Sequence, residues 1–342
     1  MRNHRFSRRD PPVTLTTHIQ YGRTTMQLKS KLLAGLAVLM LAGPAAAEGI
    51  ERAAIVMPGS ISDNGWNQAG FEGLTKAGEV LGFEAAFSES VHQPEQIEVL
   101  SDYARRGYDL VIGHGGEFQD AVERVAARFP ETMFMVNNGL GTKDNIANAD
   151  FYFSQIAYLM GYVAGSMSDT GTIGIIAAQQ FKFTTDTVAG YEAGAKAANP
   201  DVRVLVTWTG DWDDIAKGKE AALNQISQGA DVVWPTMDSA TLGSMQAVQE
   251  KGVYGIGIYR DAINEWPEIL QSAILDVRGN MRSYLDLAAA GKLEGALYRA
   301  DMGNELAMRI GSFHSDIPVD VVDEVNNLID AMKSGTLVVN PQ

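Results

Sequence analysis

The chain has 342 residues, 27 of them basic and 42 acidic, so its formal net charge is −15, and it contains no cysteine. Without cysteine it has no disulfide framework, thiolate nucleophile, cysteine-ligated zinc site or cysteine-linked lipid anchor. The acidic balance argues against nucleic acid as a partner, because binding phosphates requires clustered lysine and arginine.

The N-terminal segment, residues 1–47, differs in charge from the rest of the chain. It holds seven of the 27 basic residues and one of the 42 acids, so the remaining 295 residues carry a net charge of −21. Lys29 and Lys31 precede an apolar run at 32–42, which ends in small residues. A positive start, a short apolar middle and a small-residue end are typical of a secretory signal peptide. We predict that 26–47 is such a peptide, cleaved near Ala47.

Residues 1–25 are polar and lack periodicity, so we interpret them as an upstream start artefact before Met26. A twin-arginine signal that uses Arg8 and Arg9 is one alternative, and a buried core helix at 32–42 is another. No later segment approaches 18 apolar residues, the shortest run expected of a membrane-spanning helix. The mature protein is therefore predicted to be soluble and periplasmic.

The first half of the mature chain alternates between strands and helices. Short apolar runs bounded by glycine, proline or polar residues predict strands at 53–57, 84–87, 109–113 and 133–136. Apolar residues spaced by three and four predict helices at 67–81, 94–106 and 118–129.

The second half repeats this pattern. It predicts strands at 172–177, 203–207, 231–234 and 255–259, and helices at 188–198, 215–228 and 242–251. Corresponding strands of the two halves start 119 residues apart in the first two pairs and 122 apart in the next two. The prediction is an α/β fold with two doubly wound parallel-sheet lobes joined by a hinge. Such sheets bind ligands at the carboxyl ends of their strands, so two facing lobes would form a cleft that closes on a ligand.

The loops after the predicted strands carry the candidate site residues of the first half. Asp63, Trp66 and Asn67 follow the first strand, His114 ends the third and Asn137 ends the fourth. Each has a structural alternative. The acid can cap the next helix, the tryptophan can pack in the core and the asparagine can form a turn.

In the second half, the strand-end loops contribute Phe181, Trp212, Asp238, Tyr259 and Asp261. Asp213 or Asp214, which follow Trp212, can instead cap the following helix. Aromatic rings combined with acids and amides suit a flat, hydrogen-bonding ligand that is neutral or cationic. The absence of a basic cluster argues against a phosphate or a multiply charged anion.

Catalytic motifs are missing. The chain has no Walker loop, no G-x-G-x-x-G after the first strand, no H-E-x-x-H and no G-x-S-x-G elbow. The mature chain contains three histidines, His92, His114 and His314, and no two are close in sequence. We therefore expect no enzyme activity, cofactor or metal. A secreted enzyme similar to nucleoside hydrolases, with Asp63 and Asp261 as its acids, is the alternative from another class.

Several segments also resemble one known family. They lie in the expected order and cover most of the mature chain: Gly59–Gly73, 109–113, 118–121, 129–130, 158–162, 171–174, 194–196, 209–214, 229–233, 252–257 and 334–335. The opening segment reads Asp63-Asn64-Gly65-Trp66-Asn67-Gln68. This pattern resembles the basic membrane protein (BMP) family, the extracytoplasmic binding components of ABC importers, and is similar to its purine nucleoside receptors.

The resemblance implies a type I periplasmic binding fold that holds a purine base or purine nucleoside between two aromatic rings, Trp66 and Trp212. Asp63 and Asn67 would bond the ligand from the first lobe and Asp261 from the second. Looser matches to ligand-binding positions are His114, Asn137 (where the family usually has an acid), Phe181, Asp238 and Tyr259. The implied partner is an ABC permease in the inner membrane, and the implied state is a monomer.

The resemblance also implies lobe boundaries. The first lobe would contain 48–155 and about 276–305, and the second 156–275 and about 306–342. One departure concerns the ligand. Nucleoside-binding members carry a lysine in the hinge strand, where it meets the ribose, and this chain has Leu275 there. A free base such as adenine, or another small heterocycle, is therefore an equal candidate, and a sugar-binding protein of the same fold is an alternative.

Overall fold

The computed structural model describes residues 49–63 and 65–339. The predicted start artefact at 1–25 and the predicted signal peptide at 26–47 lie outside the described residues. Within those residues, no helix is both long and apolar enough to cross a membrane.

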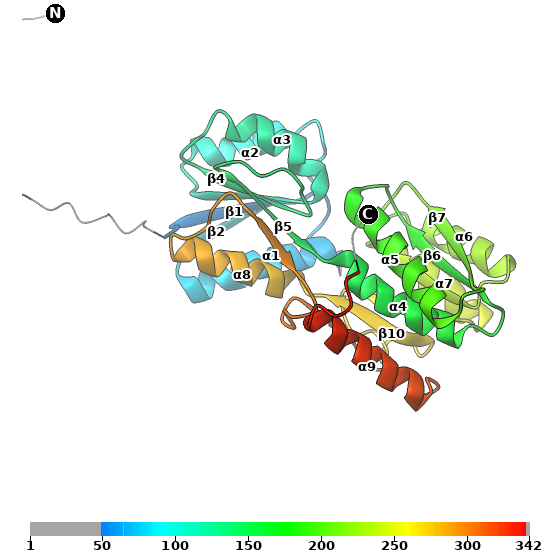
Figure 1. Ribbon diagram of the computed structural model, residues 1–342. Coiled ribbons are helices and arrows are strands. Elements are labelled where there is room, and N and C mark those ends of the chain that lie inside the picture. The colour runs from blue at the N-terminus through cyan, green and yellow to red at the C-terminus, as the bar shows by residue number, and fades with distance from the viewer. Residues whose placement is uncertain (1–48, 64, 340–342) are drawn as a thin grey trace, which may run out of the picture. The chain divides into compact units, whose positions relative to one another are not determined.

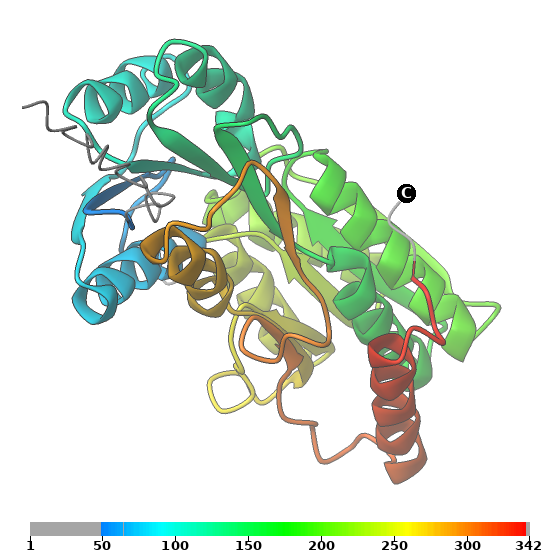
Figure 2. The same ribbon diagram turned by 60° about the vertical axis from the view of Figure 1, so that its left-hand side comes forward.

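The first sheet of the described chain has six strands, and every pairing in it is parallel. Their order across the sheet is β11 (Leu297–Ala300), β5 (Ile146–Phe151), β4 (Met133–Asn137), β3 (Leu110–His114), β1 (Arg52–Val56) and β2 (Glu84–Ser88). Figure 2 shows β11 lying alongside β5 although the two strands are far apart in the chain. Read from the other edge, the order 2-1-3-4-5 is that of a doubly wound sheet.

The second sheet repeats this order. Its strands are β12 (Met308–Ile310), β10 (Ile269–Leu275), β9 (Tyr254–Ile258), β8 (Val232–Thr236), β6 (Thr172–Ala177) and β7 (Arg203–Trp208). All pairings are parallel except that of β12, which lies antiparallel to β10. The predicted pair of doubly wound lobes is thus confirmed.

Helices cover both faces of the first sheet, because successive side chains along its strands point to opposite faces and both sets are apolar. Ala53 and Ile55 face one cluster, packed under α1 (Trp66–Leu81) and α8 (Val277–Ala289), whereas Ala54 and Val56 face the other. The second face lies under α2 (Gln96–Arg105) and α3 (Gln119–Ala126), the latter preceded by a short 3-10 turn at Gly116–Phe118. Figure 1 shows these two layers on opposite sides of the sheet.

The second sheet is covered in the same way. One face packs against α4 (Phe153–Met167) and α5 (Lys182–Ala198), and the other against α6 (Ile215–Ser227) and α7 (Ala240–Lys251). The C-terminal helix α9 (Val319–Lys333) packs on α4. Because apolar residues point from both faces, the strands read as nearly continuous hydrophobic runs.

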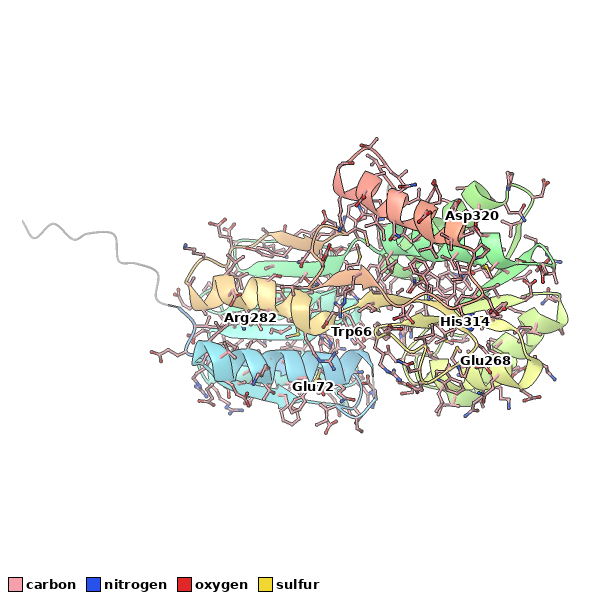
Figure 3. The ribbon with its side chains drawn as sticks, turned by 90° about the horizontal axis from the view of Figure 1, so that it is seen from below. Trp66, Glu72, Glu268, Arg282, His314 and Asp320 are labelled. Carbon is pink, nitrogen blue, oxygen red and sulfur yellow. The ribbon has the colours of Figure 1, made fainter. Side chains whose placement is uncertain are left out.

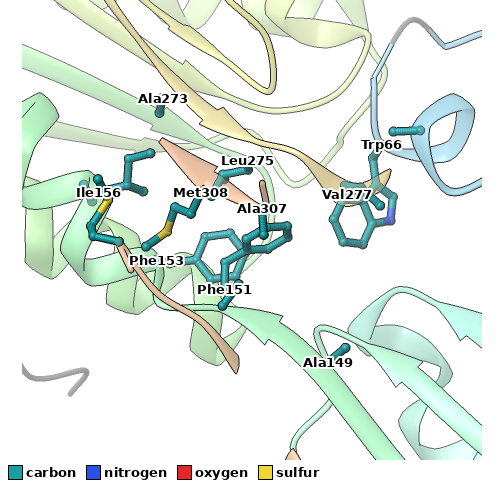
Figure 4. Close-up of a cluster of buried hydrophobic side chains, with 14 of the residues drawn as sticks. Trp66, Ala149, Phe151, Phe153, Ile156, Ala273, Leu275, Val277, Ala307 and Met308 are labelled. Carbon is teal, nitrogen blue, oxygen red and sulfur yellow. The ribbon is translucent and has the colours of Figure 1, made fainter. Parts of the chain in front are cut away.

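The chain passes between the two sheets three times, at Tyr152, at Asp276 and at 301–307. The hydrophobic core also extends from one sheet to the other, because one cluster includes strand residues of both sheets and residues of the connections between them. Figure 4 shows this part of the cluster, where Phe151 and Phe153 lie near Leu275.

The sequence patterns missed the elements around these connections. They predicted neither β5 nor α4, and after 259 they identified no element other than the hinge strand, which is β10. Predicted starts also differ, since α5 begins at Lys182 rather than at residue 188. Thr184 explains the earlier start. Its hydroxyl accepts the amide N–H of Phe181 (2.9 Å) and closes the first turn.

Candidate ligand-binding site

A cavity of about 100 Å³ lies where the carboxyl ends of the two sheets meet. Its walls come from loops and helix starts that follow strands β1, β3, β4 and β5 of the first sheet and β6, β7, β8 and β9 of the second. The lining residues are Pro58, Gly59, Trp66, Asn67, Gly115, Gly116, Glu117, Asn138, Phe153, Phe183, Trp212, Asp213, Asp238 and Tyr259. The predicted convergence of strand-end loops is therefore confirmed.

Trp66 forms the wall of the first lobe and is the first residue of α1. One face of its indole is stacked on the imidazole of His114, with ring centroids 4.3 Å apart and planes 12° apart. The indole Nε1–H donates to the carbonyl of His114 (3.3 Å), and the imidazole Nε2 lies 2.9 Å from the carbonyl of Trp66. Figure 3 places Trp66 between the elements of the two sheets.

His114 is fully buried behind that tryptophan and is held by a polar chain. Its Nδ1 lies 2.7 Å from the amide nitrogen of Asn137, whose oxygen accepts the hydroxyl of Tyr284 (3.2 Å). Burial lowers the pKa of His114 to about 4, outweighing the bond to the Trp66 carbonyl and the charge of Asp63. His114 is therefore neutral at pH 7 and supports the wall rather than facing the cavity.

Asp63 and Asn67 organise the start of α1. The Asp63 carboxylate accepts the backbone N–H groups of Gly65 (2.8 Å), Asn67 (2.8 Å) and Gln68 (3.0 Å). It also accepts the Asn67 side-chain amide (2.8 Å), whose oxygen in turn accepts the N–H of Gly59 (3.2 Å). Both side chains are thus occupied in shaping the loop after β1, which is the capping role the sequence analysis weighed for Asp63.

Trp212 forms part of the opposite wall, in the loop after β7. Its backbone carbonyl accepts the N–H groups of Asp238 (3.1 Å) and Ala240 (3.0 Å), which tie this loop to the start of α7. The next helix, α6, is capped by Asp214, which accepts two backbone N–H groups. Asp213 is left at the cavity with an exposed side chain.

Aromatic rings continue inward from Trp212. Its indole stacks on Phe183 with centroids 6.0 Å apart, and Phe183 lies 5.2 Å from the ring of Phe153. With Trp66 and Tyr259, five aromatic side chains line the cavity. Large rings with fixed positions provide stacking surface at little cost in conformational freedom.

Asp238 and Tyr259 complete the second lobe's side of the cavity. The tyrosine hydroxyl donates to the Asp238 carboxylate (3.2 Å), and the Tyr259 backbone has a φ of +68°. A bulky residue in this left-handed region is strained, and such strain concentrates at functional sites. Burial raises the pKa of Asp238 well above its usual range, and the charges of Asp63 and Asp213 add to the effect, while the tyrosine hydrogen bond opposes it.

Glu117 approaches from the loop after β3. Its side chain folds back over Gly115, where an added Cβ would lie 2.2 Å from a carboxylate oxygen, and that glycine has a φ of +148°. Burial raises the pKa of Glu117, and the bond to its own backbone N–H only partly opposes this. Three carboxylates therefore line the cavity, those of Glu117, Asp213 and Asp238.

Asn138 faces the cavity from the loop after β4. Its φ is +61°, its side chain is 9% exposed, and its Oδ1 has no hydrogen-bond partner among the described residues. A buried acceptor without a partner costs free energy, which a ligand that donates a hydrogen bond would recover.

A larger groove of about 650 Å³ adjoins the cavity and shares Asp238 and Tyr259 with it. Asp63 lies on this groove rather than in the cavity, and the exposed side chains of Ile215 and Leu242 form part of its wall. The two spaces together can take a ligand larger than the cavity alone.

The structure brings five of the ten predicted site residues to the cavity: Trp66, Asn67, Trp212, Asp238 and Tyr259. His114 and Asn137 lie behind the wall and Asp63 lies on the groove, as described above. Phe181 stacks on Phe183 (5.9 Å) without lining the cavity. Asp261 is exposed, and its carboxylate accepts the backbone N–H and the hydroxyl of Ser312.

Sequence reasoning missed Glu117, Asn138, Phe153, Phe183 and Asp213 as cavity residues. Four of them stand in strand-end loops that the sequence analysis had singled out, so their position in the chain was the available signal. Their side-chain directions were not visible in the sequence. Phe153 follows β5, which no pattern predicted.

Comparison with known proteins identifies the family. The family model described as "ABC transporter substrate-binding protein PnrA-like" (Bmp) matches residues 50–299. The chain is 29% identical over 76% of its length to a purine-binding protein of Brucella abortus, covering 74% of that protein. It is 27% identical over 85% of its length to the transcriptional activator protein med of Bacillus subtilis, covering 92% of it.

A solved structure agrees with these relatives. The ABC transporter solute-binding protein of Conexibacter woesei is 27% identical, with a TM-score of 0.66 over 85% of this chain and 98% of that one. The matched segment, 50–299, includes the strands of the first sheet up to Arg299 in β11 and every residue that lines the cavity. The chain therefore belongs to the Bmp family of ABC transporter substrate-binding proteins, whose members are binding proteins rather than enzymes.

Proposed function

We propose that the protein is the extracytoplasmic binding component of an ABC importer, and that it binds a purine base or purine nucleoside, or a similar flat heterocycle, between its two lobes. The observation that carries this proposal is the cavity itself. Five aromatic side chains line one space at the meeting point of the two sheets. Asn138, whose amide oxygen has no partner among the described residues, borders the same space. The purine-binding relative supports the same choice of ligand.

The chemistry of the walls favours a planar ligand that donates hydrogen bonds. Trp66 and Trp212 offer ring faces, while Asn138 and the three carboxylates accept hydrogen bonds. Exocyclic amino and ring N–H groups of purines meet this demand. A volume of about 100 Å³ suits a single base, and the adjoining groove has room for a ribose. Leu275 stands where nucleoside-binding members have a ribose-binding lysine, so a free base is as good a candidate as a nucleoside.

The remaining parts of the proposal concern delivery. We also propose that the protein is periplasmic, loses a signal peptide by cleavage, acts as a monomer and docks on an inner-membrane permease. The family and the charge pattern of the N-terminal segment support these parts of the proposal. We propose a first lobe of 48–155 and about 276–305, and a second lobe of 156–275 and about 306–342. The connections at 152, 276 and 301–307 form the hinge between them, and ligand binding closes the two lobes on each other.

A thermal-shift panel tests the proposal. Protein that has been unfolded, freed of ligand and refolded is melted with adenine, guanine, adenosine, guanosine, ribose, galactose and glucose. A ligand at about 100 times its Kd stabilises the folded state by roughly 2.7 kcal/mol, which raises the melting temperature by several degrees. We expect a rise with at least one purine. A rise with a sugar and none with any purine would make the protein a sugar-binding member of this fold instead.

The same samples test the enzyme alternative. Incubation with adenosine or guanosine should leave the nucleoside intact when analysed by chromatography. Release of free base by the wild-type protein, abolished in the Asp63→Asn variant, would favour hydrolysis over transport.

A further inference from the structure

The cavity has an unbalanced charge. Among its lining residues, all of which the structure describes, there are three carboxylates and no lysine, arginine or histidine. The nearest histidine, His114, is buried behind Trp66 and is neutral at pH 7 because its pKa is about 4. Within the described chain, Glu117 and Asp213 have no ion pair, in contrast to many acids on the outer surface.

A second observation is independent of these acids. The Oδ1 of Asn138 is buried and has no hydrogen-bond partner in the described chain, and this residue lines the same cavity. Asn138 therefore adds an unsatisfied acceptor beside the cavity. The groups around the cavity therefore present acceptors and negative charge from both lobes, and few donors of their own.

The acids do not form a metal site. No group of three histidine, cysteine, aspartate or glutamate side chains in the described residues is arranged to hold a metal ion. Five aromatic side chains line the cavity together with the carboxylates. Indole and phenol faces attract organic cations, and their effect grows when water is excluded.

We propose that the cavity selects a flat heterocycle that carries a positive charge over its neutral isostere. The carboxylates of Glu117 and Asp238, from opposite lobes, neutralise the charge, while Trp66, Trp212 and Phe183 cover the faces of the ring. The Asn138 Oδ1 accepts an N–H of the ligand. This inference rests on the proposed function, because it assumes a planar ring in this cavity, and it specifies the charge of that ring.

The protonation state of the acids supports the proposal. Burial, together with neighbouring negative charge, raises the pKa of Asp238 well above its usual range, and burial raises that of Glu117. A cation placed between these groups lowers both pKa values again. Binding of a cationic ligand should therefore release protons, and a neutral ligand should release fewer.

Matched nucleosides test the inference by isothermal titration calorimetry near pH 6.5 on refolded, ligand-free protein. The pairs are adenosine with 1-methyladenosine and guanosine with 7-methylguanosine, in which methylation leaves the ring positively charged. The methyl groups occupy different positions, so a clash at one position does not decide the result. We expect the cationic member to bind about tenfold more tightly in at least one pair. Titration in phosphate and in imidazole, which both buffer at this pH and differ in ionisation enthalpy, should show that it also releases more protons.

Variants assign the effect to the acid. Asp238→Asn should weaken binding of the cationic member about tenfold more than it weakens binding of the neutral member. Asp144→Asn removes the same charge from an exposed residue before the amino end of β5, away from the cavity, and should keep the wild-type preference. An equal loss of both ligands in Asp238→Asn would assign that residue a structural role and contradict the inference.

The outcomes separate this inference from the function on which it rests. Neutral members that bind as tightly as the cationic ones, or more tightly, in both pairs would overturn the inference and leave purine binding intact. Absence of binding by all four nucleosides and by the free bases would overturn both.

Discussion

Trp66 is held in position by contacts within the protein itself. His114 covers one face of the indole, two hydrogen bonds link the two residues, and Asn137 and Tyr284 fix the imidazole in turn. The side chain is only 8% exposed. A ring that is already ordered loses little freedom on binding, so more of its stacking energy contributes to affinity.

Replacement of Trp66 by alanine should remove most ligand binding. Stacking of a base on an aromatic side chain contributes roughly 1–3 kcal/mol, so we expect a roughly 10- to 100-fold increase in Kd by calorimetry. Trp208→Ala serves as the control, because Trp208 lies in β7 and does not line the cavity. Wild-type affinity in Trp66→Ala, with the control unchanged, would exclude the indole as a stacking surface.

His114 should make the fold sensitive to acid. Its pKa is about 4 in the folded protein and about 6.5 for an ordinary histidine, so the unfolded chain takes up the proton first as the pH falls. Its contribution to stability is complete above about pH 6.5 and is lost between pH 6.5 and 4, by up to about 3 kcal/mol.

Urea titrations at pH 7, 5.5 and 4.5 measure this loss. Between pH 7 and pH 4.5 the wild-type protein should lose about 2 kcal/mol more of its unfolding free energy than His114→Gln, which keeps a polar side chain but does not titrate. His92→Gln, which removes an exposed histidine, controls for the deletion of an imidazole. Parallel stability curves for wild type and His114→Gln would show that His114 is not the titrating group.

At the scale of elements, the pairing of α4 with α5 sets the width of the aromatic wall. Phe153 is the first residue of α4 and Phe183 lies in the first turn of α5, and both line the cavity. The helices approach closely through glycines. A Cβ at Gly190 would lie 2.4 Å from the carbonyl oxygen of Ser154, and one at Gly165 would lie 2.7 Å from that of Ala195.

Alanine at these glycines should separate the helices. Both Gly190→Ala and Gly165→Ala should lower the unfolding free energy by about 1–3 kcal/mol, the cost of overpacking, although alanine is the better helix former. Gly190 lies one residue after the first two turns of α5, near the rings, so its variant should also weaken ligand binding severalfold. Gly165 contacts α5 far from the cavity, and its variant should bind normally.

Urea unfolding and calorimetry measure the two effects, and Lys196→Ala, at an exposed position of α5, is the neutral control. Unchanged stability in both glycine variants would show that the helices can move apart at no cost.

Strand and helix patterns predicted the elements that have a clear period or a clear boundary, and they failed elsewhere for physical reasons. The strand β5 is buried throughout, yet it contains Asn148 and Asp150, which bond to the Gly141 carbonyl and to Arg299. Arg299 is 149 residues from Asp150, so the sequence around β5 does not show why these polar residues are buried, and the strand reads as polar. The helix α4 is buried on most of its surface and lacks the polar stripe of an amphipathic helix.

The site was predictable as a set of loops and not as a set of side-chain directions. Parallel strands bring their carboxyl ends to one edge, which is why Trp66, Trp212 and Tyr259, chosen from loop position and from the family resemblance, line one cavity. The direction of Asp261 depends on Ser312, 51 residues away, and no local pattern contains that information.

At the scale of the molecule, the two sheets share one core. A single hydrophobic cluster includes Ile55 and Ile112 of the first sheet, Met302 and Ala307 of the connection at 301–307, and Ile175 of the second sheet. The lobes are therefore joined by packed side chains as well as by the chain itself.

This continuity predicts a single unfolding transition for the ligand-free protein. Differential scanning calorimetry should show one peak, and urea curves followed by far-UV circular dichroism and by tryptophan fluorescence should coincide. Ligand should move the whole transition upward without splitting it. Two resolved transitions, of which only one responds to ligand, would show that the lobes unfold independently.

The position of β11 has a consequence for how the chain reaches this structure. The edge of β5 is covered by β11, but residues 152–296 separate the two strands. While the chain is being synthesised or exported, the edge of β5 that pairs with β11 keeps its backbone hydrogen-bonding groups unpaired until residues 297–300 are available. Late, long-range pairing of this kind slows folding and leaves the incomplete sheet able to pair with other chains. A chaperone would therefore protect the first sheet most during the interval before β11 pairs with β5.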